Sequence, residues 1–142
     1  MSKFYEAVAT YLDDELRKKR ETYLVDAETC SDVEYIILEE LDGHHNLDVI
    51  SVKLTNIEEV HEHESEDSYE GTPMKWYKCK WSMISVSETS GKERYTPFWW
   101  AVLAKTTEEA NDLITHLLTD TMGSWKIDSI SESKIVELLT KK

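Results

Sequence analysis

Apolar and polar residues alternate along the segment from Trp76 to Val86. Such alternation is typical of a β-strand with one buried side, because successive strand side chains point to opposite faces. The next residues, Glu88–Lys92, include Gly91 and favour a turn, and residues 94–104 are rich in aromatic and branched side chains. The pattern therefore predicts a β-hairpin over residues 76–104. Its predicted buried positions on the first strand are Tyr77, Cys79, Trp81 and Met83.

A helical pattern follows the predicted hairpin. Thr106 and Glu109 have the spacing of a capping box, in which the side chain of each residue accepts a hydrogen bond from the backbone amide of the other. Apolar residues then recur at helical spacing and form one stripe, at Ala110, Leu113, Ile114, Leu117 and Leu118. We expect this helix to end within 119–123, a strand to follow at 125–130, and a short helical turn to include Ile135, Leu138 and Leu139.

The same order of patterns occurs in the first half of the chain. Residues 23–29 (YLVDAET) match residues 100–106 (WAVLAKT), and the apolar helix positions that follow them match at the same offset. The aromatic pairs Phe4-Tyr5 and Trp76-Tyr77 precede these matches, and residues 57–60 resemble 135–138. In the first half, Ser31–Glu34 is the expected helix cap, Gly43 the expected helix end, and residues 50–54 an alternating strand. Repeated patterns of this kind indicate repeated structural units.

The segment from Ser2 to Arg20 fits two structures. Phe4, Val8, Leu12 and Leu16 lie four residues apart, which is typical of a helix. Tyr5, Ala7, Ala9 and Tyr11 alternate, which is typical of a strand. The repeat places this segment opposite the alternating 76–82 region, and we therefore predict a hairpin strand rather than a helix.

These patterns predict an α+β fold built by tandem duplication of a ββαβ unit. We expect residues 1–142 to form a single domain of two repeats, 1–57 and 74–142, joined by an acidic segment at 58–73. The sheet or sheets are expected to be antiparallel, with the two main helices on one face. A hydrophobic content of 40% with five Trp and seven Tyr is typical of a folded globular protein.

The chain is strongly acidic, with a formal net charge of −13. Between Lys53 and Lys75 there is no Lys or Arg, and the acids of this stretch are Glu58, Glu59, Glu62, Glu64, Glu66, Asp67 and Glu70. This charge disfavours duplex DNA, RNA and anionic membranes as partners and favours a basic protein surface. The alternative interpretation is a solvated acidic linker that aids solubility.

The sequence also predicts where the protein resides. No apolar run is long enough for a secretory signal or a membrane span. The two cysteines, Cys30 and Cys79, are expected to be reduced and buried, as is usual in cytosolic proteins. We therefore expect a cytoplasmic protein without a membrane partner.

Several short motifs occur in order along nearly the whole chain: YLVDA at 23–27, WYKCK at 76–80, SGKE at 90–93 and ISES at 130–133. Together they resemble an uncharacterised domain family that is common in Bacteroidetes genomes and their phages. The resemblance implies an intracellular bacterial or phage protein, in the host cytoplasm if phage-encoded, and brings no catalytic residue. Compared with that family, the acidic segment is longer and the cluster Phe98-Trp99-Trp100 is more aromatic, so a particular function is expected there.

Candidate reactive residues are few. His61 and His63 are weak metal candidates, since His-x-His spacing on a strand places both rings on one face. A solvated acidic loop is the competing interpretation. The four glycines are explained by turns and helix ends, and no phosphate-binding loop or strained nucleophile turn is recognisable. We predict no catalytic residue, no cofactor and no enzymatic activity.

Two sets of residues are candidate contact surfaces. The cluster Phe98-Trp99-Trp100 cannot place all three rings on one face of a strand, so an exposed aromatic there predicts a protein interface. A sheet covered on both faces, or a homodimer, is the alternative explanation. Aromatic and basic residues interleaved on a strand can hold single-stranded nucleic acid. The residues of this second set are Trp76, Lys78 and Lys80, with Arg17, Lys18, Lys19 and Arg20 on the first hairpin.

The sequence thus predicts a non-enzymatic protein that binds a macromolecule. The leading hypothesis is an accessory of phage or bacterial nucleic-acid metabolism or host takeover. Its acidic surface would contact a basic or DNA-binding protein, for example by mimicking the charge of DNA. The alternative hypothesis is a single-stranded DNA-binding protein that uses the aromatic and basic strand face.

Overall fold

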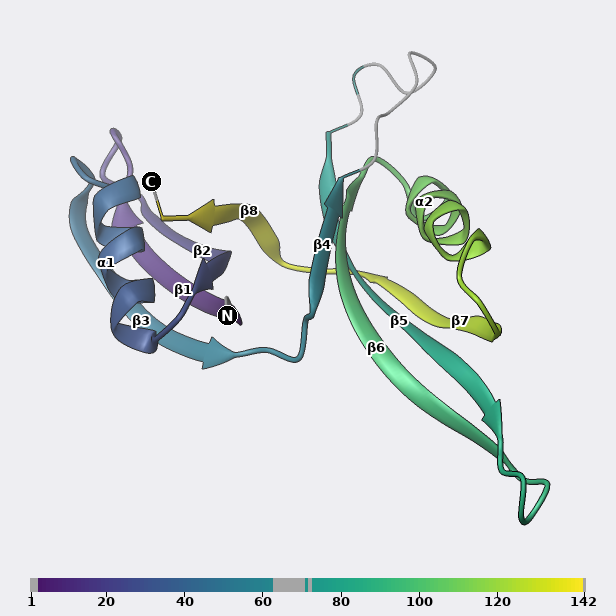
Figure 1. The fold of residues 1–142 in the computed structure, drawn as a ribbon. Coiled ribbons are helices and arrows are strands. Elements are labelled where there is room, and N and C mark those ends of the chain that lie inside the picture. The colour runs from purple at the N-terminus through teal and green to yellow at the C-terminus, as the bar shows by residue number, and fades with distance from the viewer. Residues whose placement is uncertain (1–2, 63–70, 72, 142) are drawn as a thin grey trace. The chain divides into compact units, whose positions relative to one another are not determined.

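The computed structural model describes residues 3–62, 71 and 73–141 (Figure 1). The chain forms two compact units, unit 1 from Met1–Asn56 with Lys134–Lys142 and unit 2 from Ile57–Ser133. The described residues form eight strands and two helices, which confirms the predicted α+β class. Each unit contains one four-stranded sheet and one helix.

Unit 1 begins with an antiparallel hairpin, which confirms the strand prediction for the first residues of the chain. Its sheet has the order β3-β1-β2-β8. The last strand, β8, runs parallel to β2 and places Leu139 opposite Val25. The elements are β1 (Lys3–Leu12), β2 (Lys18–Ala27), α1 (Cys30–Glu40), β3 (His45–Leu54) and β8 (Ile135–Thr140).

Unit 2 has the same arrangement, with the sheet order β4-β6-β5-β7. Its hairpin strands pair along their full length, from Lys75 opposite Ala104 to Val86 opposite Glu93. The short strand β4 runs parallel to β6. The elements are β4 (Glu59–Glu62), β5 (Lys75–Val86), β6 (Glu93–Ala104), α2 (Thr107–Thr119) and β7 (Ser124–Glu132).

The sequence similarity between 57–60 and 135–138 coincides with the parallel strands of the two units. Val60 on β4 lies opposite Ala101, and Leu138 on β8 lies opposite Leu24, which are matching positions of the two hairpins. The prediction of antiparallel sheets is therefore wrong, because each sheet is mixed. A parallel neighbour does not follow from a tight turn, so hairpin signals alone could not reveal it. The duplication itself stays a prediction.

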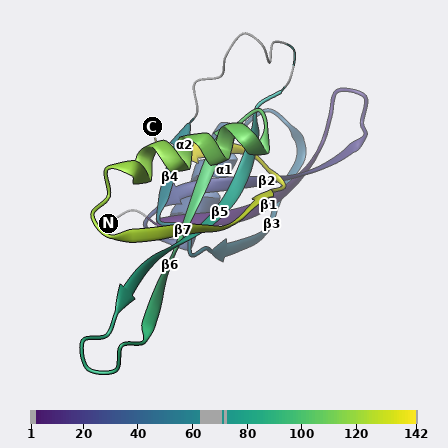
Figure 2. The same cartoon turned by 90° about the vertical axis from the view of Figure 1, so that its right-hand side faces the viewer.

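Each helix covers one face of the sheet in its own unit. α1 packs on all four strands of unit 1, and α2 packs mainly on β6 and β7 (Figure 2). The core of unit 1 consists of Ala and branched side chains together with Tyr5 and Tyr23. The core of unit 2 includes the larger rings of Trp81 and Trp100. Tyr77, Cys79 and Trp81 are buried and Met83 packs against them, which confirms the predicted inner face of this strand.

The helix cap predicted from the sequence is confirmed in unit 2, whereas the cap in unit 1 is a different residue from the predicted one. Thr106 accepts a hydrogen bond from the Glu109 amide at 3.1 Å, and the Glu109 carboxylate accepts one from the Lys105 amide at 2.9 Å. In unit 1 the cap is Thr29, which accepts from the Asp32 amide at 3.2 Å, and not the predicted Ser31. Thr29 is the match of Thr106 in the repeated pattern, so the repeat was the better guide.

The predicted helical turn after Ile135 is wrong, because these residues form β8. The four-residue spacing of Ile135 and Leu139 suits a helix locally. Leu139 instead joins the core of unit 1 through pairing with β2, so a contact far along the chain overrides the local pattern. Part of the segment 58–73, predicted as a joint between repeats, likewise forms strand β4.

Candidate functional site

Two aromatic rings and two lysines lie together on the face of the unit 2 sheet opposite α2. Lys80 on β5 lies opposite Trp99 on β6, and its ammonium nitrogen is 5.2 Å from the centre of the Trp99 ring. The ammonium nitrogen of Lys126 on β7 is 4.6 Å from the centre of the Tyr95 ring. We name these four residues the basic–aromatic strip. A cation over an aromatic face is attracted by the electrons of the ring.

A carboxylate partly neutralises the basic–aromatic strip. Asp128 lies 3.4 Å from the Lys126 ammonium nitrogen and accepts a hydrogen bond from the Ser82 hydroxyl. The hydrogen bond from Ser82 and the nearby lysines hold the pKa of Asp128 below its usual value, so this group is ionised at neutral pH. The strip therefore presents aromatic surface with only a modest positive charge.

The three consecutive aromatic residues of β6 divide between the two faces of the sheet, as the alternation predicted. Trp100 is 5% exposed, and its ring centre lies 5.2 Å from that of Trp81 in the core. Phe98 stacks on the same Trp81 ring with centres 4.5 Å apart. Of the three, only Trp99 points away from the core and remains a candidate for contact with a partner.

Trp76, a candidate for contact with nucleic acid, is 3% exposed, so its ring is buried and is not available for stacking on bases. Alternation identifies the side of the sheet on which a residue lies but not what covers that side. Lys78 is half-buried, and Lys80 belongs to the basic–aromatic strip. The other basic candidates, Arg17 to Arg20, are exposed in unit 1, where Arg17 contacts Glu15 and Lys19 lies 3.9 Å from Asp13.

The acidic candidates divide between described and undescribed residues. Glu58, Glu59 and Glu62 are exposed on and beside β4, and the Glu58 amide donates to the Trp99 carbonyl at 2.9 Å. Glu64, Glu66, Asp67 and Glu70 lie outside the described residues. The described acidic surface of this segment is therefore the edge formed by β4.

A second acidic surface, which was not among the predicted candidates, lies between α2 and β7. This groove of about 470 Å³ has Glu108 and Asp112 on its helix side and Ile127, Asp128 and Ile130 on its strand side. We name it the α2–β7 groove. Glu108 and Asp112 are exposed and one helical turn apart, so both carboxylates face the same side. Their spacing on the polar face of α2 was the available signal.

Only one of the two predicted metal candidates is described. His61 lies on β4, with its Nε2 atom 3.3 Å from a Glu59 carboxylate oxygen and its ring centre 4.6 Å from that of Trp100. His63 lies outside the described residues. Within the described part of the chain, no group of three or more His, Cys, Asp or Glu side chains is placed to hold a metal ion.

Unit 1 contains a hydrogen-bonded cluster that no sequence pattern predicted. The hydroxyls of Tyr11 and Tyr23 donate to the two carboxylate oxygens of Glu21 at 2.6 and 2.5 Å. The Glu21 hydrogen bond raises the pKa of Tyr11 to about 12, and burial, followed by the same carboxylate, raises the pKa of Tyr23. Phenols held neutral in this way are structural donors rather than reactive groups.

Replacing the shared acceptor should change the titration of Tyr11. In Glu21→Gln the charge is lost, and we expect the Tyr11 pKa to fall from about 12 toward its ordinary value of 10.0. The native state holds the phenol proton more tightly than the unfolded state does. The stability from this bond is therefore complete below pH 10 and declines as the pH rises toward 12. Ultraviolet absorbance titration measures the shift, and an unchanged titration would contradict the assignment.

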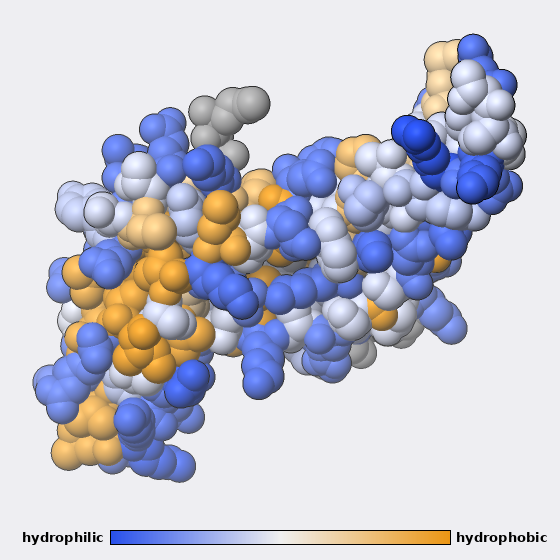
Figure 3. All heavy atoms as spheres, turned by 90° about the horizontal axis from the view of Figure 1, so that it is seen from below, coloured by the Kyte–Doolittle hydropathy of each residue, from blue (hydrophilic) through white to orange (hydrophobic). Residues whose placement is uncertain are grey.

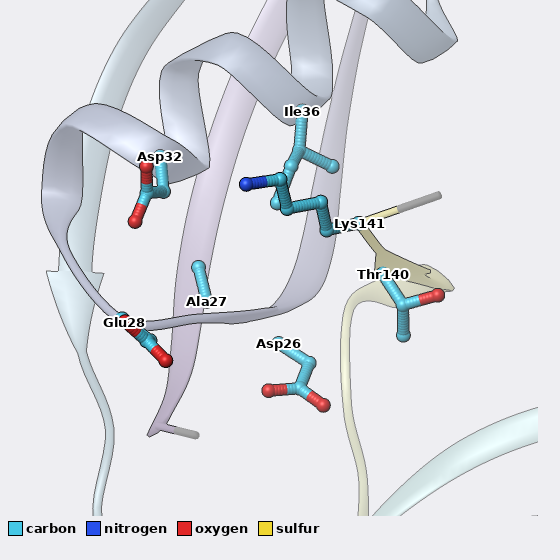
Figure 4. Close-up of a pocket in the computed structure, with 7 residues that line it drawn as sticks. All are labelled: Asp26, Ala27, Glu28, Asp32, Ile36, Thr140 and Lys141. Atoms are coloured by element: carbon cyan, nitrogen blue, oxygen red, sulfur yellow. The ribbon is translucent and has the colours of Figure 1, made fainter. Parts of the chain in front are cut away.

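A cavity of about 290 Å³ lies in unit 1 at the start of α1 (Figure 4). Carboxylates of Asp26, Glu28 and Asp32 line it, and the side chain of Lys141 extends toward α1. Its charges are mixed, and it contains no set of side chains that suggests a particular ligand.

Hydrophobic side chains also gather at the surface of unit 1 (Figure 3). The large exposed hydrophobic residues on α1 and β3 are Tyr35, Leu38, Ile50 and Leu54. Surface clusters of this kind occur at protein contacts, including those between identical subunits. The homodimer stays a prediction.

The two cysteines differ in accessibility, so the expectation that both are buried is wrong for Cys30. Cys30 is exposed at the start of α1, and Cys79 is buried; both are free thiols. Burial raises the pKa of Cys79 to about 12.

We therefore expect Cys30 to react quickly with a thiol reagent at mildly alkaline pH and Cys79 to react only after unfolding. Cys30→Ser should remove the fast reaction, and Cys79→Ser should leave it. Two equally fast thiols in the native protein would contradict this arrangement.

The comparisons with known proteins give a family and no activity. Neither described helix is long and apolar enough to cross a membrane. No curated protein matches the sequence. The family described as Domain of unknown function (DUF4494) matches residues 3–141, which is nearly the whole chain. This agrees with the resemblance to an uncharacterised family, while its distribution in Bacteroidetes and phages stays a prediction. The chain belongs to the family Domain of unknown function (DUF4494).

Proposed function

We propose that this protein is a non-enzymatic binding protein that contacts a basic protein through the acidic surface of unit 2. The observation that carries the proposal is the α2–β7 groove, where Glu108 and Asp112 stand exposed on one helix face. None of the residues that line this groove is Lys or Arg. The net charge of −13 adds long-range attraction for a basic partner.

The partner we propose is a DNA-binding protein of the host or of the replication machinery. Such proteins carry basic surfaces that match phosphate charges, which repeat every ~1.7 Å along duplex DNA. An acidic protein that occupies such a surface would compete with DNA. The proposed role is thus an accessory of phage or bacterial nucleic-acid metabolism or of host takeover.

A selection from displayed random peptides tests the proposed chemistry. Peptides of about ten residues, the upper end of ordinary strand length, would be selected on the immobilised protein near physiological salt. We expect the recovered peptides to be enriched in Lys and Arg and to dissociate when the salt concentration is raised. Recovery of peptides without basic enrichment would contradict the proposal.

A second candidate function is binding of single-stranded DNA, and the basic–aromatic strip favours it. Bases can stack on the rings of Trp99 and Tyr95 while Lys80 and Lys126 contact phosphates. If this function holds, a labelled single-stranded oligonucleotide binds at low salt, and Lys80→Glu with Lys126→Glu abolishes that binding. Binding that these changes leave intact would exclude the strip as the site.

A further inference from the structure

The strand β7 forms an edge of its sheet beside the acidic face of α2. Within the described residues, β7 pairs only with β5, so the backbone groups along its other side have no strand partner. The strand is nine residues long, from Ser124 to Glu132. An extended peptide can bind such an edge by adding a strand, with main-chain hydrogen bonds supplying affinity.

The α2–β7 groove would position the side chains of an added strand. Residues of an added strand that point to the helix side would lie beside Glu108 and Asp112, and Ile127 and Ile130 form the apolar floor. Asp128, the extra residue of a bulge in β7, also lines the groove, but its carboxylate is engaged by Ser82 and Lys126, so the charge of the groove comes from Glu108 and Asp112. Alternate side chains of a strand share one face, so a peptide with Lys or Arg at alternate positions would match this arrangement.

The geometry points to the edge of β7 as the docking site for an extended basic segment of the partner protein. This inference rests on the proposed function and adds where, and in which conformation, the partner binds. The other edge of this sheet, β4, is four residues long, against nine in β7. Both edges carry acidic residues, so the greater length of β7 and the groove beside it favour β7.

A synthetic peptide of alternating Lys and Val, labelled with fluorescein, tests the site by anisotropy. Its control alternates Glu and Val. We expect the basic peptide to bind at low salt and Glu108→Gln with Asp112→Asn to weaken binding about tenfold, since two favourable charges are lost. The matched control, Glu34→Gln with Glu39→Gln, removes two exposed acids from α1 and should change affinity much less.

Backbone amide exchange distinguishes an added strand from simple charge attraction. Bound peptide should slow exchange at alternate amides of β7 and leave β4 unchanged. Protection confined to β4 would overturn the β7 site and leave contact through the acidic surface of unit 2 intact. Equal loss of affinity in both charge variants would overturn the β7 site and also the assignment of the contact to unit 2. No binding of the basic peptide by the unsubstituted protein would overturn the proposed function as well. Self-association through β7 would raise the mass measured in solution from that of a monomer to that of a dimer as the protein concentration increases. This result would also overturn the site.

Discussion

Trp100→Ala should destabilise unit 2 by about 3–5 kcal/mol, the usual cost of removing a large aromatic side chain from a core. Trp100 is 5% exposed and contacts the rings of both Trp81 and His61. A small protein has a total stability of about 5–15 kcal/mol, so this loss leaves little of it. Urea unfolding followed by circular dichroism measures the change.

Trp99→Ala is the matched control for that substitution. Trp99 is the neighbouring residue on the same strand, but it is half-buried on the opposite face under Lys80. We expect this change to cost about 1–2 kcal/mol, because less surface and one cation contact are lost. Equal destabilisation by the two substitutions would contradict the assignment of Trp100 to the core and Trp99 to the other face.

Removal of β8 should unfold unit 1 while unit 2 keeps its structure. A chain that ends at Ser133 lacks Ile135 and Leu139, both buried, and exposes the edge of β2 to water. Each lost side chain removes about 1.5–3 kcal/mol of burial free energy, and the hydrogen bonds to β2 are lost as well. The free energy of unfolding of so small a unit is low, because small domains bury a smaller fraction of their surface.

The distribution of tryptophan allows the two units to be followed separately. All five Trp lie in unit 2, at positions 76, 81, 99, 100 and 125. We therefore expect the shortened chain to keep native Trp fluorescence and to lose part of its far-ultraviolet circular dichroism. A chain that ends at Thr140 keeps β8 and serves as the control. A large shift of Trp emission in the shorter chain would show that the two units unfold together.

Local patterns predicted the elements of this fold better than their pairing. The alternation at 76–86 and the capping box at Thr106 fixed a strand and a helix correctly, because both depend on neighbouring residues. The partners of β4 and β8 depend on strands far away along the chain. The local spacing of residues 135–139 therefore predicts a helical turn, although their similarity to 57–60 links the two parallel strands.

The candidate surfaces were predictable in part. Trp99 and Trp100 lie on opposite faces because successive strand residues alternate. The burial of Trp76 instead depends on which residues cover its face of the sheet, and no local pattern predicts them. The Glu21 cluster and the basic–aromatic strip could not be predicted from local patterns, because both depend on the register between neighbouring strands. Tyr95 and Lys126 are separated by α2 in sequence and meet only because β6 and β7 both pair with β5.

The most direct test of the proposed function compares two probes on one protein preparation. Fluorescence anisotropy would be recorded for the labelled alternating Lys–Val peptide and for a labelled single-stranded oligonucleotide, at low and near-physiological salt. Contact with a basic protein predicts that the peptide binds, that salt weakens this binding, and that the oligonucleotide does not bind. Salt-sensitive binding of the oligonucleotide without binding of the peptide would contradict the account and assign function to the basic–aromatic strip.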